Sequence, residues 1–98
     1  MIRHTVMFRF DVNAQRADID AFSNGLTEMA PKIEEIVAFR HGFDLGVNAG
    51  NFDYVVTADF ASVDGYLAYR DHPIHKEVIA RTAHVVGERA AVQFEWDS

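Results

Sequence analysis

The fold is decided by residues 37–60, which read VAFRHGFDLGVNAGNFDYVVTADF. Apolar and polar residues alternate on both sides of the glycine- and asparagine-rich segment 46–51, and this two-residue period is typical of β-strands. The pattern predicts one strand over residues 37–45 and a second over residues 52–60, joined by a turn as a hairpin requires. The fold then depends on which elements form in the segments before and after this hairpin.

The segment before the hairpin predicts a strand and then a helix. Residues 4–10 alternate with the period of a strand that buries one face. Apolar residues then recur at steps of three and four from Ile19 to Ile36, which indicates an amphipathic helix. Pro31 lacks an N–H group and disfavours helical geometry in the preceding residue, so the regular helix should end near Met29 or Ala30.

The segment after the hairpin predicts a broken helix and a last strand. Ser62 is a suitable N-cap for a helix that runs to about Asp71, and Pro73 interrupts it before a second helical stretch that reaches about Val85. Residues 89–96 alternate again and should form a strand. Its inward-facing residues are expected to be Val92, Phe94 and Trp96.

The order strand, helix, strand, strand, broken helix, strand predicts one α+β domain over residues 1–98. It is the split βαβ pattern of a ferredoxin-like sandwich, in which a four-stranded antiparallel sheet carries its helices on one face. The residues expected to face the helices are Val6, Phe8, Phe39, Phe43, Tyr54, Val56, Phe94 and Trp96.

The opposite face of the predicted sheet has a mixed character. It is too apolar for water and too polar for a core, and a chain of 98 residues buries a smaller fraction of its surface than a chain of about 150 residues. Pairing two such faces across a two-fold axis would give a homodimer that encloses a barrel-like interior, a dimeric α/β barrel. The residues assigned to this face are Thr5, Met7, Arg9, Val55, Thr57, Ala91 and Gln93.

Composition narrows the class of protein. The nine basic residues are scattered and outnumbered by 15 acidic ones, a net charge of −6 that disfavours nucleic-acid binding. The chain has no cysteine, hence no disulfide and no thiolate chemistry. The first ten residues lack the apolar run of a signal peptide and no segment is long enough to cross a membrane, so we expect a cytoplasmic protein.

The segment YRDHPIH, residues 69–75, concentrates the polar chemistry. Pro73 should begin a new helix with His72 before it and His75 in its first turn, where the positive helix end disfavours imidazolium and leaves a neutral base. If the first strand is central in the sheet, Tyr69, His75 and His4 can meet at one end of the layer between helices and sheet.

Simpler interpretations of these residues stay open. Tyr69 could be a tyrosine at the edge of the core with a hydrated hydroxyl, and His75 could be a hydrogen-bonded histidine of a helix start. We expect no metal site, because His72 and His75 lack a third ligand at suitable spacing.

Three segments together resemble the stress-responsive dimeric α/β-barrel (Dabb) family: HTVMFRF at residues 4–10, HGFDLGVNAGNFDYVVTADFAS at 41–62 and YLAYRDHPIH at 66–75. The resemblance spans nearly the whole chain and implies the dimeric ferredoxin-like barrel. Within the family, the segment around Pro73 is similar to the polyketide-cyclase branch of the olivetolic acid cyclase type.

The resemblance implies a cofactor-free cyclase or lyase acting on an aromatic or polyketide-like molecule. His75 would abstract a proton next to a carbonyl, and Tyr69 would hold the oxygen that becomes an enolate. The alternative is a non-catalytic, stress-associated dimer that is structural or sequesters a small hydrophobic ligand. The residues expected to line the pocket are His4, Val6, Phe8, Phe22, Tyr54, Val56, His72, Ile79 and Phe94.

Overall fold

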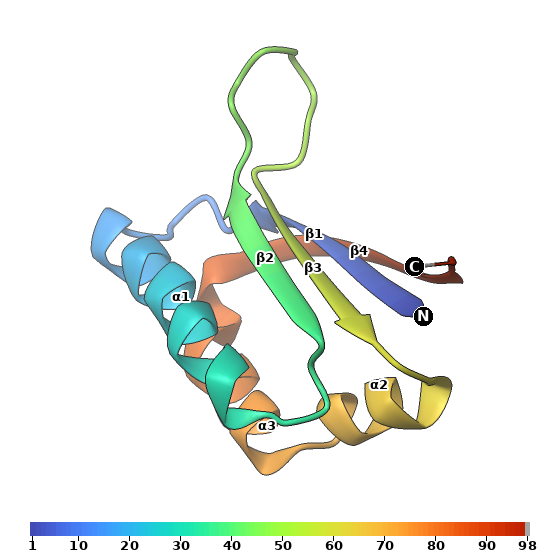
Figure 1. The fold of residues 1–98 in the computed structure, drawn as a ribbon. Helices are drawn as coiled ribbons and strands as arrows, with labels where there is room; N and C mark the ends of the chain where they lie inside the picture. Colours follow the sequence, from blue (N-terminus) through green and yellow to red (C-terminus); the bar gives the residue numbers. More distant parts are fainter. Residues whose placement is uncertain (98) are drawn as a thin grey trace.

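The computed structural model describes residues 1–97 and has one layer of helices packed on one face of a four-stranded sheet (Figure 1). All strand pairs are antiparallel and the order across the sheet is β2-β3-β1-β4, which confirms the predicted ferredoxin-like arrangement. The elements are β1 (Ile2–Phe10), α1 (Arg16–Met29), η1 (Ala30–Lys32), β2 (Ala38–Phe43), β3 (Tyr54–Phe60), α2 (Val63–Arg70), α3 (Pro73–Thr82), η2 (Ala83–Val85) and β4 (Val86–Glu95).

The hairpin is present, with shorter strands than the sequence predicts. β2 ends at Phe43 and β3 begins at Tyr54, and the loop between them projects away from the helices (Figure 1). Gly46 and Gly50 adopt φ angles of 74° and 86°, values that favour glycine, so the loop turns at these two positions.

The core lies between the sheet and α1. The helix buries Phe22, Leu26 and Met29 on one stripe, and Pro31 stands in the short 3-10 turn η1 that ends the helix at the predicted place. These side chains pack against residues from β1 and β3. The buried hydrophobic residues are Val6, Phe22, Leu26, Met29, Ile33, Tyr54, Val56, Ala58, Phe60, Tyr69, Val78 and Val85.

The last strand presents the opposite faces from those predicted. The register pairs His4 with Gln93 and Val6 with Ala91, so Gln93 and Ala91 share the helix-facing side of the sheet, and their assignment to the open face was wrong. Alternation defines two faces of a strand without saying which one meets the helices, and here the more apolar face of β4 is the open one. The residues corrected to the open face are Val92, Phe94 and Trp96.

No helix within residues 1–97 has the length and apolar character needed to cross a membrane.

Candidate active site

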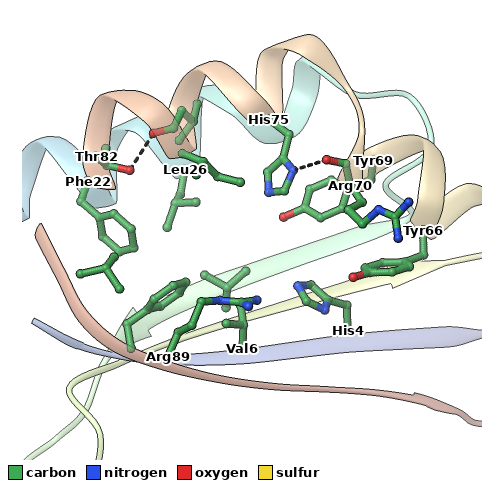
Figure 2. Close-up of a pocket in the computed structure, with 15 residues that line it drawn as sticks. His4, Val6, Phe22, Leu26, Tyr66, Tyr69, Arg70, His75, Thr82 and Arg89 are labelled. Carbon is green, nitrogen blue, oxygen red and sulfur yellow. Dashed lines mark hydrogen bonds between the residues drawn. The ribbon is translucent and has the colours of Figure 1, made fainter. Parts of the chain in front are cut away.

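A cavity of about 410 Å³ lies between the helices and the helix-facing side of the sheet (Figure 2). Its volume is within the usual range of small-molecule sites. Aliphatic and aromatic side chains form most of its wall, and the polar groups come from β1, α2, α3 and β4. The lining residues are His4, Val6, Phe8, Phe22, Leu26, Val56, Tyr66, Tyr69, Arg70, His75, Val78, Ile79, Thr82, Val86 and Arg89.

The helix break at Pro73 fixes the protonation pattern of His75. In a continuous helix the N–H of Ile74 would donate to the carbonyl of Arg70. Here that N–H donates to Nδ1 of His72 (3.1 Å), because His72 caps the new helix. The carbonyl of Arg70 is left for His75 Nδ1, 3.1 Å away. A carbonyl can only accept, so neutral His75 carries its proton on Nδ1 and has its lone pair on Nε2.

His75 and Tyr69 form a stacked pair at the cavity wall. Their ring centroids are 4.1 Å apart with an interplanar angle of 29°. Burial lowers the pKa of His75; the hydrogen bond to the Arg70 carbonyl opposes this shift and the charge of Arg89 adds to it. Burial likewise raises the pKa of Tyr69. The pair is therefore a neutral imidazole beside a protonated phenol, whose hydroxyl points into the cavity in Figure 2.

His4 joins this pair from the first strand. Its ring centroid lies 6.0 Å from that of Tyr69 and 5.1 Å from that of Tyr66, and its side chain is buried. Burial, the charge of Arg89 and the neighbouring His75 lower the pKa of His4 to about 4. The amide of Gln93 donates to Nδ1 of His4 (2.8 Å), so the neutral ring carries its proton on Nε2. The structure thus brings Tyr69, His75 and His4 together at one end of the layer.

Arg89 is a cavity residue that the sequence prediction missed. It lies on β4 opposite Phe8 and shares the helix-facing side with Gln93. The sequence analysis did not assign Arg89 and placed Gln93 on the open face, because it exchanged the two faces of β4. The sequence did contain a hint: Arg89 and Gln93 are four residues apart and so lie on the same face of the strand. A polar face of this kind fits beside the inward-facing His4 on the neighbouring strand.

Three residues predicted to line the cavity lie elsewhere. Phe94 is on the open face and 46% exposed, because β4 turns toward the helices the face that was predicted to point away from them. His72 turns its ring toward the backbone of α3, which it caps. Tyr54 is buried behind Phe22 and its hydroxyl is engaged elsewhere. The predicted residues that do line the cavity, besides the stacked pair, are His4, Val6, Phe8, Phe22, Val56 and Ile79.

Tyr54 belongs to a separate chain of hydrogen bonds. Its hydroxyl contacts Nδ1 of His41 and Oγ of Ser23, and Nε2 of His41 is 2.9 Å from Oγ1 of Thr27. Thr27 donates to the carbonyl of Ser23, so its oxygen accepts from His41 Nε2 and Tyr54 donates to the free Nδ1. Burial lowers the pKa of His41, which favours this neutral form of the ring. This cluster ties α1 to the sheet outside the cavity.

The cavity lining combines basic and hydrogen-bonding side chains and contains no acidic residue. Its lining contains two imidazoles, two phenols and two guanidinium groups, and no Asp or Glu. Within the described part of the chain, no three His, Cys, Asp or Glu side chains are grouped as a metal site would need. His75 Nε2 can accept a proton, and Tyr69 can donate a hydrogen bond to a developing oxyanion.

The comparisons with known proteins agree with this fold. A family model described as Stress responsive A/B Barrel Domain matches residues 2–96. A stress-response A/B barrel domain-containing protein of Arabidopsis thaliana is 24% identical over 95 residues, which cover 94% of this chain and 83% of the relative.

Two solved structures show how widely the fold is shared. A dimeric ferredoxin-like protein of unknown function from Thermobifida fusca is 36% identical with a TM-score of 0.90, and the match covers 97% of this chain and 90% of that one. The hydroxynitrile lyase of Passiflora edulis has a TM-score of 0.84 at 20% identity, with 95% and 90% of the two chains covered. The family match over nearly the whole chain confirms the resemblance seen in its three sequence segments. The chain belongs to the stress-responsive A/B barrel domain family.

Proposed function

We propose that the protein is a cofactor-independent enzyme of the cyclase or lyase type that removes a proton next to a carbonyl group. The substrate would be an aromatic or polyketide-like small molecule held in the cavity. The observation that carries the proposal is the state of His75: its Nδ1 proton is held by the Arg70 carbonyl, and its basic Nε2 is left at a cavity wall beside a protonated tyrosine.

The reaction would begin with a substrate carbonyl hydrogen-bonded to the hydroxyl of Tyr69. His75 Nε2 takes the α-proton, the electron pair of the broken C–H bond forms a C=C bond, and the π pair of the carbonyl moves to its oxygen to give an enolate. Tyr69 stabilises that oxygen, and the Arg70 carbonyl stabilises the imidazolium through the Nδ1 proton. In a cyclase, the enolate carbon then attacks a second carbonyl of the same molecule, and His75 returns the proton to the new alkoxide.

The fold family is compatible with this chemistry, since the hydroxynitrile lyase of Passiflora edulis has the same fold. Fold alone does not specify a reaction, so the proposal depends on the geometry of His75 and Tyr69.

The test is proton exchange in a neutral probe. Phenylacetone in D₂O exchanges its benzylic protons, and NMR follows the loss of their signal. We expect the wild-type protein to accelerate this exchange, and His75→Ala to reduce the acceleration by at least about a hundredfold, the usual contribution of a positioned general base.

Two further variants make the test specific. His75→Gln keeps an amide donor for the Arg70 carbonyl without a basic nitrogen and should be as inactive as His75→Ala. His84→Ala removes a surface histidine that lies 3.6 Å from Asp18 and should exchange at the wild-type rate. Full activity in both folded His75 variants would contradict the proposal, and binding of the probe without any exchange would support the ligand-sequestering alternative.

We also propose that the chain forms a homodimer through the open face of the sheet. The support is the apolar character of that face, where Met7, Val55, Val92 and Phe94 are exposed by 37–62%. The Thermobifida fusca relative, at 36% identity, is a dimer. Monomers rarely leave a contiguous apolar patch of this kind in water.

A further inference from the structure

The charges of the cavity residues do not balance. Two arginines, Arg70 and Arg89, lie among the lining residues, and no aspartate or glutamate does. The cavity is thus locally positive in a chain whose formal charge is −6. Because the chain as a whole is negatively charged, its surface in general repels anions, whereas the cavity should attract them.

Arg70 already has a partner. Its Nε lies 3.0 Å from Oδ1 of Asp71 and its second guanidinium nitrogen lies 3.2 Å from Oδ2, so the two groups form an exposed bidentate pair. The positive charge of Arg70 is therefore largely compensated by its neighbour.

Arg89 differs from Arg70 in having no acidic partner within residues 1–97. The adjacent carboxylate, Glu88, points to the other face of β4 and binds Arg9 at 2.9 Å, because successive strand residues alternate in direction. Besides Arg70, the other titratable groups that line the cavity are the imidazoles of His4 and His75 and the phenols of Tyr66 and Tyr69. None of them supplies a negative charge.

Arg89 lies at the boundary between solvent and the apolar interior of the cavity. The residue is exposed and also lines the cavity, so it stands where the cavity meets solvent. In Figure 2 its guanidinium lies beside Val6 and toward His4, in the layer between the helices and the sheet. The apolar wall of the cavity includes Phe8, which pairs with Arg89 across the sheet, together with Phe22 and Leu26.

We propose that Arg89 binds a carboxylate of the substrate, so that the site takes aromatic or acyl carboxylates whose apolar body lies against Phe8, Phe22 and Leu26. A guanidinium presents a planar fork that matches a planar carboxylate with two parallel hydrogen bonds, and the neutral surroundings strengthen that pairing. The proposal names the substrate class of the function proposed above and rests on it for the reaction, while the binding it describes is measurable without turnover.

The test uses a matched pair of ligands, hydrocinnamate and its neutral amide hydrocinnamamide, titrated by NMR or calorimetry. The wild-type protein is expected to bind the acid about tenfold or more tightly than the amide, the smallest preference that one charge-assisted pair should give. Arg89→Gln should bind the two equally, and Arg89→Lys should keep a reduced preference for the acid.

Two controls assign the effect. Arg81→Gln makes the same change of charge on the surface of α3 and should leave the preference unchanged. His75→Ala should also keep it, so loss of catalysis and loss of carboxylate recognition can be told apart. Equal affinities in the wild type, no measurable binding of the acid, or a full preference retained in Arg89→Gln would each overturn the assignment of Arg89.

Discussion

At the scale of single residues, the site depends on where three protons are held. The Arg70 carbonyl keeps one on Nδ1 of His75, and the Gln93 amide leaves one on Nε2 of His4. Burial keeps the third on the phenol of Tyr69. These three groups therefore offer one free lone pair, on His75, and two hydrogen-bond donors, on His4 and Tyr69, which is the complement that the proposed enolisation needs.

His4 should make the protein less stable in mild acid. Its folded-state pKa of about 4 lies below the ordinary 6.5, so the unfolded chain binds this proton more readily. The free energy of unfolding should be highest above pH 6.5 and fall as pH drops toward 4, by up to about 3 kcal/mol from this residue. Urea unfolding at fixed protein concentration across this range measures the effect.

His4→Gln is the matched variant for this measurement, since glutamine does not titrate. Its unfolding free energy should fall less steeply over the same pH range, with the remaining slope due to His41 and His75, whose pKa values are also lowered. Parallel curves for the wild type and the variant would show that His4 does not contribute the slope.

At the scale of elements, the sequence predicted where helices end and begin better than which face of a strand points toward the helices. Pro31 and Pro73 act within one helical turn, so the end of α1 and the restart at α3 followed from local sterics. Tyr69 and His75 were placed together for the same reason. The facing of β4 is a tertiary property: its apolar residues Val92 and Phe94 fit either layer, and only the register with β1 decides between them.

The start of α3 should depend on the side chain of His72. Its Nδ1 accepts the N–H of Ile74, one of the donors that a helix start otherwise leaves unpaired. His72→Ala should lower the free energy of unfolding by about 1 kcal/mol, the typical value of an N-cap, and His72→Asn should restore most of it because asparagine is a strong N-cap residue. Urea unfolding of the three proteins at neutral pH measures this.

The N-cap of α2 provides a control for the effect of removing the N-cap of α3. Ser62 caps α2 in the same way, with its hydroxyl accepting from the N–H of Gly65 at 3.1 Å, so Ser62→Ala should cost a similar amount. A loss in Ser62→Ala without one in His72→Ala would mean that α3 is held by its buried residue Val78 and the tertiary contacts, independently of its cap.

At the scale of the whole molecule, β4 connects the cavity to the proposed dimer. It is an edge strand of the sheet, with Arg89 and Gln93 toward the helices and Val92 and Phe94 toward the open face. A partner packed on the open face would cover the apolar side chains and hold the strand in place. Dimer formation should therefore also order the side of β4 that carries Arg89.

Light scattering after size exclusion should give twice the mass of the chain for the wild type. Val92→Glu should shift the protein to monomers and weaken association by more than about a hundredfold, because each protomer would bury an unpaired carboxylate at the interface. Val12→Glu makes the same change at a loop residue that is 95% exposed and should remain dimeric. If Val92→Glu is also fully dimeric, the partner occupies another surface. If it is monomeric and folded, its affinity for hydrocinnamate should also fall, since the strand that carries Arg89 would have lost the support of the partner.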